Sequence, residues 1–324
     1  MTDWRTEREQ ALVTLEQSKE RGVRNDAAER LHELAVEAPD RWPELTELIP
    51  RLLADEQDDV RRVAVALGAL MLEPEDAGTF LGLRMKDPSA TVRLEAVGQL
   101  ADLGRPEGRG VLAAGLQDPA FGVRFEAARG MATLRHSAGM EVLVEALEQD
   151  ALRFRALGAL AELGDPKALP AIQRVFKRWF LPGFERTQAA GALAKLGDAD
   201  GGKHLLERAK GRWYPDRALA IELCGEVHAE GAFAQLLTIL GDVKDACRGA
   251  AARGLGRLGN PEAAALLTKT LEERTAPEDL RLDAAEGLCL LQHEGVRAAL
   301  ERALPTFDSP AAREELEVML ADYL

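Results

Sequence analysis

The chain has 324 residues and a formal net charge of −14, with 46% hydrophobic and 30% charged residues. No apolar run approaches the ~18 residues of a membrane span, and the N-terminal stretch lacks the basic and apolar regions of a signal peptide. Three cysteines, an odd count without paired spacing, argue against a disulfide framework. Composition therefore predicts a cytoplasmic protein that does not cross a membrane.

Residues 1–21 predict a single polar helix, which we expect to close the first unit of an array. From residue 22 to residue 308, an arginine recurs at steps of 29 to 37 residues, followed each time by the same small and aliphatic pattern. The nine copies are Arg24, Arg61, Arg93, Arg124, Arg153, Arg186, Arg217, Arg248 and Arg281. Self-similarity at a period of about 20 to 50 residues is typical of a stacked array, in which each unit buries its apolar face against its neighbours.

Each unit predicts two short helices. After Arg93, Ala96 and Leu100 follow at three and seven residues, which is the spacing of one helical face. Gly104 suits a left-handed helix end, and Pro106 opens the second helix, where a missing N–H costs nothing. At the same point of other units stand the N-cap residue types Asp165, Asp198 and Asn260. Because no stretch alternates with period two, we expect about 19 or 20 helices and almost no strand.

These residues resemble HEAT repeats, most closely the short bacterial HEAT-like units named after phycobilisome lyases. The residues that carry the resemblance are Asp87-Pro88 with Val92-Arg93, Asp118-Pro119 with Val123-Arg124, and Leu163-Gly164-Asp165-Pro166. The resemblance implies an all-α fold: a right-handed α-solenoid of about nine HEAT-like helical hairpins with terminal capping helices. We expect one continuous domain over residues 1–324, with repeats at 22–308.

Some units depart from this pattern. An insertion around Trp42-Pro43 is expected to lengthen the inter-helix turn of the first unit. Glu185 and Asp216 each precede a recurring arginine, where the family has an aliphatic residue. Irregular units are where we expect the curvature of the array to change or a partner to bind.

The recurring arginines are predicted to form a structural ladder, because the same feature occurs in every unit and a binding site would occur once. We expect each arginine to pair with an acidic group of its own or of the next unit. The candidates, each six residues before an arginine, are Asp55, Asp87, Asp118 and Asp242.

The middle of the chain differs from the rest in charge and in aromatic content. Residues 167–217 hold 11 Lys/Arg and 5 Asp/Glu, a net charge of +6, together with six of the chain's 15 aromatic residues. Since aromatic and arginine side chains are enriched at binding hot spots, this composition predicts a recognition patch for an acidic partner segment. The predicted patch residues are Arg174, Lys177, Arg178, Trp179, Lys203, Arg208, Lys210, Arg212, Trp213 and Tyr214. In the alternative, both tryptophans fill gaps between repeats and the cations only solvate an outer face.

The last 16 residues, 309–324, predict a closing helix with Ser309 as its N-cap and Pro310 in its first position. The whole pattern favours a non-enzymatic adaptor or scaffold that binds another protein, with the second helix of each unit lining the inner face. We expect no metal and no cofactor, because no phosphate loop, nucleophile–base pair or histidine and cysteine ligand spacing is present.

The alternative function is enzymatic. HEAT-like alkylpurine DNA glycosylases use tryptophans, arginines and an aspartate, and Trp213, Asp216 and Arg217 invite that comparison; a tetrapyrrole lyase-type protein shares the repeat pattern. An N-cap role explains Asp216 more simply, however. A DNA groove should also be basic over several repeats, so nucleic acid is not the expected partner.

Overall fold

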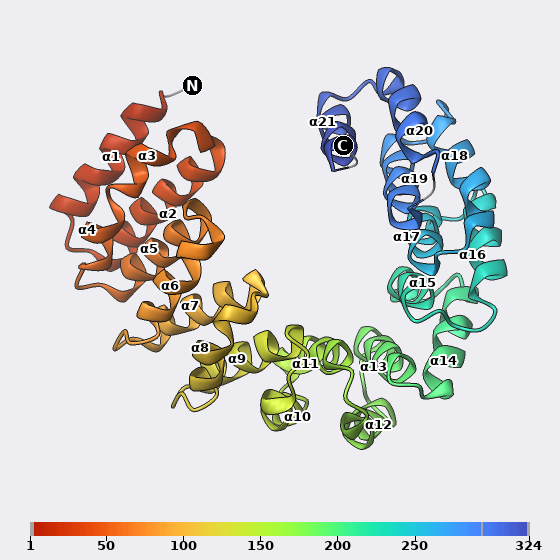
Figure 1. Ribbon diagram of the computed structural model, residues 1–324, viewed down its shortest axis with the longest axis horizontal. Helices are drawn as coiled ribbons and strands as arrows, with labels where there is room; N and C mark the ends of the chain where they lie inside the picture. The colour runs from red at the N-terminus through yellow and green to blue at the C-terminus, as the bar shows by residue number, and fades with distance from the viewer. Residues whose placement is uncertain (1–2, 293, 323–324) are drawn as a thin grey trace. The chain divides into compact units, whose positions relative to one another are not determined.

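The computed structural model describes residues 3–292 and 294–322, which form 21 α-helices, six 3₁₀-helices and no strand (Figure 1). The prediction of an all-α solenoid is confirmed. Contacts between residues divide the chain into two compact units, residues 1–149 and 150–324.

The helices of unit 1 are α1 (Trp4–Gln17), α2 (Arg21–Glu37), α3 (Trp42–Thr46), α4 (Ile49–Leu53), α5 (Asp58–Met71), α6 (Pro74–Arg84), α7 (Ala90–Leu103), α8 (Arg109–Gly115), α9 (Phe121–Thr133) and α10 (Met140–Ala146). The helices of unit 2 are α11 (Asp150–Leu163), α12 (Leu169–Phe176), α13 (Gly183–Lys195), α14 (Ala199–Lys210), α15 (Arg217–Glu226), α16 (Ala232–Gly241), α17 (Arg248–Leu258), α18 (Ala264–Glu272), α19 (Glu278–Leu291), α20 (Val296–Ala303) and α21 (Pro310–Ala321). The 3₁₀-helices are Pro39–Arg41, Pro106–Gly108, Ser137–Gly139, Pro166–Ala168, Pro261–Ala263 and Leu304–Thr306.

The helix count exceeds the expected number because the second helix of the first unit is split into α3 and α4. Pro50 has no N–H to donate to the carbonyl of Thr46, so one continuous helix cannot pass this point. The insertion around Trp42-Pro43, which we expected to lengthen a turn, instead forms a 3₁₀-helix followed by α3. The irregularity therefore changes the second helix as well as the turn.

The turns within the other hairpins follow the predicted capping pattern. α7 buries Ala96 and Leu100 and ends at Gly104, whose φ of 59° is left-handed. Each of four side chains accepts a backbone hydrogen bond as an N-cap: Asp165, Asp198, Asn260 and Ser309. These capping predictions are confirmed.

Within unit 2, the arginine-bearing helices α11, α13, α15, α17 and α19 lie on the concave side of its arc, and α12, α14, α16 and α18 lie on the convex side (Figure 1). The expectation that second helices line the inner face is therefore wrong for unit 2. Glycines let the first helices approach closely. A Cβ added to Gly225 would lie 2.2 Å from the carbonyl oxygen of Gly254, and one added to Gly256 would lie 2.4 Å from that of Gly287. Close approach on one side of the stack makes that side the shorter one.

Most of the recurring arginines join consecutive repeats. Arg61 donates to both carboxylate oxygens of Asp87 at 2.9 Å, and to the carbonyl of Asp55 at 2.9 Å. Arg93 binds the carboxylate of Asp118 at 2.7 and 2.9 Å and the carbonyl of Asp87 at 2.9 Å. The Asp-Pro loop at Asp87 is thus held by its own arginine and by that of the preceding unit. The other ladder ion pairs are Arg24–Asp55, Arg153–Glu185, Arg217–Asp245 and Arg248–Glu273.

Three ladder arginines have no acidic partner in the described chain, so the predicted pairing is wrong for them. Arg124 donates to the carbonyls of Asp118 and Pro119. Arg186 donates to carbonyls of the segment before α13, and Arg281 donates to the carbonyls of Leu271 and Thr306 and to a threonine hydroxyl. Carbonyl and hydroxyl oxygens here take the place of a carboxylate. Asp242 was also predicted as an acidic partner of a ladder arginine, but it forms an ion pair with Arg212. The carboxylate that pairs with Arg217 is that of Asp245.

The two ends carry single helices. α1 buries Ala11 and Leu15 where it packs on α2, and α21 buries Ala312 and Leu316 where it packs on α19 and α20. Each helix covers an end of the apolar interior with one face and turns polar residues outward, as terminal elements of an array must.

Candidate partner-binding patch

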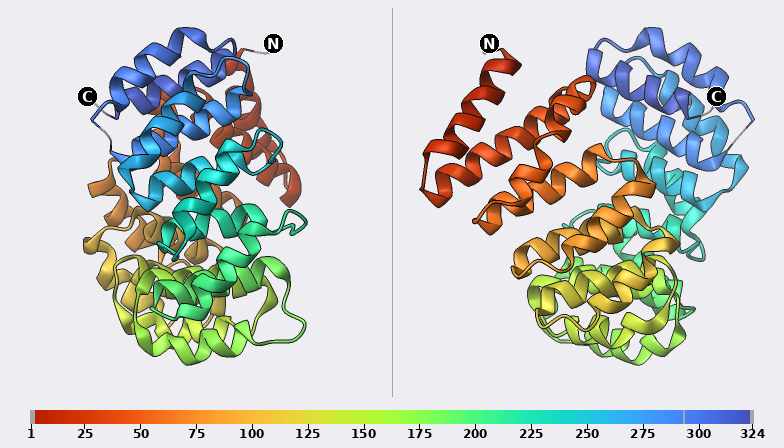
Figure 2. Two further views of the ribbon diagram at one scale, coloured as in Figure 1. Left: turned by 90° about the vertical axis from the view of Figure 1, so that its right-hand side faces the viewer. Right: turned by 60° about the vertical axis from the view of Figure 1, so that its left-hand side comes forward.

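Two loops of unit 2 carry the aromatic residues of the predicted patch. Residues 177–182 connect α12 to α13, and residues 211–216 connect α14 to α15. Each loop joins a second helix to the next first helix, so both project from the same edge of unit 2 (Figure 2). They present Trp179 and Trp213 on adjacent repeats, as the equivalent positions of these residues in the sequence predict.

The tips of both loops face solvent. Trp179 is 86% exposed, Phe180 is 92% exposed and Trp213 is 96% exposed. The Trp179 and Phe180 rings meet edge to face, with centroids 6.4 Å apart. The alternative in which the two tryptophans fill gaps between repeats is therefore wrong. The sequence-based patch omitted Phe180, although its place beside Trp179 was the signal that could have included it.

Arg186 holds the loop that carries Trp179. Its guanidinium donates to the carbonyl of Phe176 at 2.5 Å and to that of Arg178 at 2.6 Å. This ladder arginine thus fixes backbone on both sides of Lys177. A loop held in this way loses less conformational freedom when a partner binds.

A buried carboxylate holds the loop that carries Trp213. Asp216 is fully buried and accepts hydrogen bonds from Arg208 at 2.9 and 3.0 Å and from the hydroxyl of Thr187. Arg208 also lies over the ring of Tyr214, 4.0 Å from its centroid. The predicted N-cap role of Asp216 is wrong, because its side chain makes no cap hydrogen bond and is engaged by these donors instead. Arg208, predicted to contact a partner, is occupied in positioning this loop.

The remaining cations differ in how far neighbouring acids compensate them. Ion pairs join Lys203 to Asp200 at 3.5 Å, Lys210 to Glu207 at 2.9 Å and Arg212 to Asp242. The backbone N–H of Lys244, together with Arg212, holds the pKa of Asp242 below its usual range. Arg174 and Lys177 are exposed and form no ion pair with a described residue, whereas Arg178 is half-buried. Uncompensated positive charge therefore lies at the end of α12, close in sequence to Trp179.

The groups behind the loops are a half-buried histidine and a buried carboxylate. His204 packs edge-on against Phe176 with ring centroids 5.2 Å apart, and burial together with Arg208 and Arg186 lowers its pKa. Asp216, the acid that invited comparison with a glycosylase, has no surface through which to meet a substrate. Within residues 3–292 and 294–322, no cluster of three or more His, Cys, Asp or Glu side chains is placed to hold a metal ion. Nor does any helix there have the length and apolar character needed to cross a bilayer.

Comparison with known proteins identifies the repeats. The profile for HEAT repeats matches residues 79–153 and 213–289, and the profile for the PBS lyase HEAT-like repeat matches residues 152–178. The chain therefore belongs to the HEAT-like repeat proteins, and the resemblance read from its Asp-Pro and Val-Arg motifs is confirmed. No curated protein sequence matches the chain.

Several solved structures are similar to this one. The CpcE–CpcF complex of phycocyanin lyase from Nostoc sp. PCC7120 is 19% identical, over 86% of this chain and 94% of that chain, with a TM-score of 0.45. Human deoxyhypusine hydroxylase in complex with glycerol is 22% identical, over 77% and 96% of the two chains, with a TM-score of 0.34. Kap95p, from a structure with RanGDP, is 14% identical, over 98% of this chain and 50% of that chain, with a TM-score of 0.43. At these identities and scores the likenesses say nothing of substrate or partner.

Proposed function

We propose that this protein is a non-enzymatic, cytoplasmic scaffold that binds an acidic segment of another protein through the basic-aromatic patch of residues 174–214. The observation that carries the proposal is the exposure of three large aromatic side chains on two adjacent loops, each loop held by hydrogen bonds from a half-buried arginine. Loop tips of this size and apolarity leave a large area to be covered by a partner, since each aromatic side chain can bury about 150–250 Å².

The distribution of charge gives the partner segment a direction. Arg174 and Lys177 are free to meet carboxylates, whereas the cations around Trp213 are already compensated. Adjacent helices in a stack lie about 8–10 Å apart, which an extended chain covers in about three residues. We therefore expect acidic residues at the α12 end of the segment, followed about three residues later by a proline or an aliphatic residue over Trp213.

A pulldown from native lysate tests the proposal, with wild type compared with Trp179→Ala/Trp213→Ala and the captured protein then purified and titrated. If the tryptophans are hot spots, the double variant should raise Kd by about 30-fold or more, which corresponds to about 2 kcal/mol. Because both side chains are exposed, the melting temperature should stay close to that of wild type. A loss of stability with unchanged affinity would contradict the proposal.

Charge variants separate the patch from general attraction to a basic segment. Arg174→Glu/Lys177→Glu should slow association strongly, and the affinity that remains should fall less steeply than that of wild type as salt is raised. The matched control, Lys203→Glu/Lys210→Glu, makes the same change in net charge at two lysines that are paired with acids, and it should change affinity by less than about threefold. Equal effects of the two pairs would show that binding follows net charge and not this patch.

A further inference from the structure

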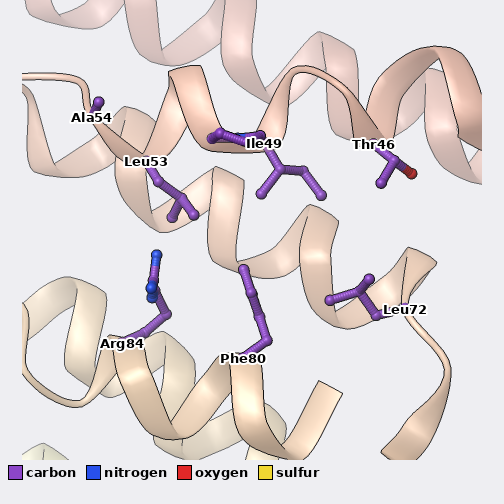
Figure 3. Close-up of a pocket in the computed structure, with 8 residues that line it drawn as sticks. Thr46, Ile49, Leu53, Ala54, Leu72, Phe80 and Arg84 are labelled. Atoms are coloured by element: carbon purple, nitrogen blue, oxygen red, sulfur yellow. The ribbon is translucent and has the colours of Figure 1, made fainter. Parts of the chain in front are cut away.

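An open apolar groove runs between α4 and α6 in unit 1, at a distance in sequence from the patch (Figure 3). One part of the groove has a volume of about 510 Å³ and includes Ile49, Leu53 and Phe80. A second hollow, of about 680 Å³, is lined by Trp42 and Met71, and it adjoins the first at Thr46, which lines both. Figure 3 shows Ile49 and Leu53 on one wall facing Phe80 and Arg84 on the other.

The groove follows from the split second helix of the first unit. The short helix α4 and the helix α6 both pack on α5, which lies between them in sequence. The ring of Phe80 lies against bare backbone of α5, because a Cβ added to Gly68 would come within 2.4 Å of that ring. The absence of a side chain at Gly68 thus lets the Phe80 ring pack close to the α5 backbone, and the space on the other side of the ring stays open.

One wall of the groove is formed by two short helices. Trp42 and Thr46 lie about one turn apart on α3, and Ile49 and Leu53 lie about one turn apart on α4, so each of the two short helices contributes two side chains to this wall. A straight helix from Trp42 to Leu53 would be about 17 Å long, at about 1.5 Å per residue, and the break between α3 and α4 makes this an upper limit for the wall. A wall of up to about three turns, facing an open hollow, has the dimensions of a surface that receives another helix.

The two ends of the groove carry opposite charges. At the Leu53 end, Arg84 is half-buried over the ring of Phe80, 5.2 Å from its centroid, and no ion pair to it occurs within the described chain. At the Trp42 end, the exposed side chains of Asp40 and Glu47 border the hollow and are likewise without an ion pair there. A ligand that fills the groove therefore meets a cation at one end and anions at the other.

We propose that this groove binds an amphipathic α-helix of a partner protein, about three turns long, with aliphatic residues at i, i+4 and i+7. Its acidic end lies at Arg84 and its basic end lies at Asp40 and Glu47. Acidic residues favour the N-terminus of a helix and basic residues its C-terminus, so the bound helix runs antiparallel to α4. This site does not depend on the patch in unit 2, and the two surfaces allow one scaffold to hold two segments.

Fluorescence anisotropy with three labelled synthetic peptides of about 14 residues tests the proposal on the full chain. The matched peptide has leucines at i, i+4 and i+7, glutamates in its first turn and lysines in its last. The second peptide exchanges the two charged ends, and the third keeps the composition but scatters the leucines. The matched peptide should bind at least about tenfold more tightly than either of the others.

A charge reversal in the protein supplies the decisive arm. Arg84→Glu should weaken the matched peptide by about tenfold and strengthen the exchanged one, while Arg109→Glu, an exposed arginine on α8, should change neither. Binding of all three peptides within twofold of one another, or indifference to Arg84→Glu, overturns the proposal. Sedimentation of the protein without peptide tests whether a second copy of the chain fills the groove instead. Self-association that is abolished by Leu53→Glu would assign the groove to a second copy and would also overturn the proposal of a partner helix.

Discussion

Removal of Arg217 should destabilise unit 2 far more than removal of any surface arginine. Its side chain is 7% exposed and that of its partner Asp245 is 3% exposed. Nη1 and Nη2 donate to the two carboxylate oxygens at 2.7 and 2.8 Å, and Nε donates to the carbonyl of Ala209 at 2.8 Å. Arg217→Ala deletes all three hydrogen bonds in a site that water reaches poorly.

The loss of stability expected for Arg217→Ala depends on how the remaining carboxylate of Asp245 is compensated. Without Arg217, the carboxylate of Asp245 keeps the backbone N–H of Cys247 at 2.9 Å and has Arg212 no closer than 3.9 Å. Breaking a buried pair by removing one partner costs about 3–5 kcal/mol, because the remaining charge is desolvated without compensation. We expect that loss for Arg217→Ala. Arg217→Met/Asp245→Leu should recover a large part of it, since the unpaired charge is gone as well.

Urea unfolding followed by circular dichroism measures these differences. Arg297→Ala is the matched control: its ion pair with Glu301 spans i to i+4, both side chains are more than half exposed, and its loss should cost less than about 1 kcal/mol. Arg124→Ala, which removes hydrogen bonds to two carbonyls but no ion pair, should fall between the two. A cost below about 1 kcal/mol for Arg217→Ala would falsify the view that these arginines tie the repeats together.

Three further outcomes follow from close packing and burial. Gly225→Ala should lower the free energy of unfolding in urea by about 1–3 kcal/mol, because its Cβ would lie 2.2 Å from the carbonyl oxygen of Gly254. Gly98→Ala, whose Cβ would meet nothing within 4 Å, should raise the free energy of unfolding by about 0.5–1 kcal/mol. Arg93 lowers the pKa of Asp118. The stability that this carboxylate contributes is therefore present above its unfolded pKa of about 4 and is lost as pH falls through its folded pKa. Asp118→Asn should flatten the dependence of unfolding free energy on pH below about pH 4. Burial raises the pKa of Cys224 to about 12, so titration with a thiol reagent at about pH 8 should leave this thiol unmodified until denaturant is added.

The sequence predicted the helical hairpins well because their signals are local. Gly104 ends a helix in a left-handed conformation and Asp165 caps the next one, both decided by residues within a single turn. The recurring arginines could be predicted in part: most of them pair with an acid of the next unit, whereas Arg124 and Arg186 donate to carbonyls of the segment before their own helix. What lies within one repeat, or repeats regularly, could be predicted from this one chain.

Features that depend on packing between repeats could not be read in the same way. The concave side of unit 2 is set by glycines such as Gly225 and Gly254, whose close approach is visible only when two helices are placed together. The loop backbone next to Trp179 and the buried carboxylate of Asp216 are likewise held by donors from other segments, Arg186 in one case and Arg208 with Thr187 in the other. Each of these is a contact between residues at least eight positions apart in the sequence.

The departures from the repeat pattern account for the position of the patch. In a regular unit, an aspartate six residues before the arginine lies in the loop, and the preceding unit's arginine holds it there, as Arg61 holds Asp87. In the two irregular units, the acid stands directly before the recurring arginine. Glu185 forms an ion pair with Arg153, and Asp216 forms an ion pair with Arg208. Moving the acid to the start of the helix leaves the loop tip without a carboxylate anchor. The tip can then project aromatic side chains into solvent while its base stays fixed, so the surface that we propose for a partner coincides with the two departures from the family pattern.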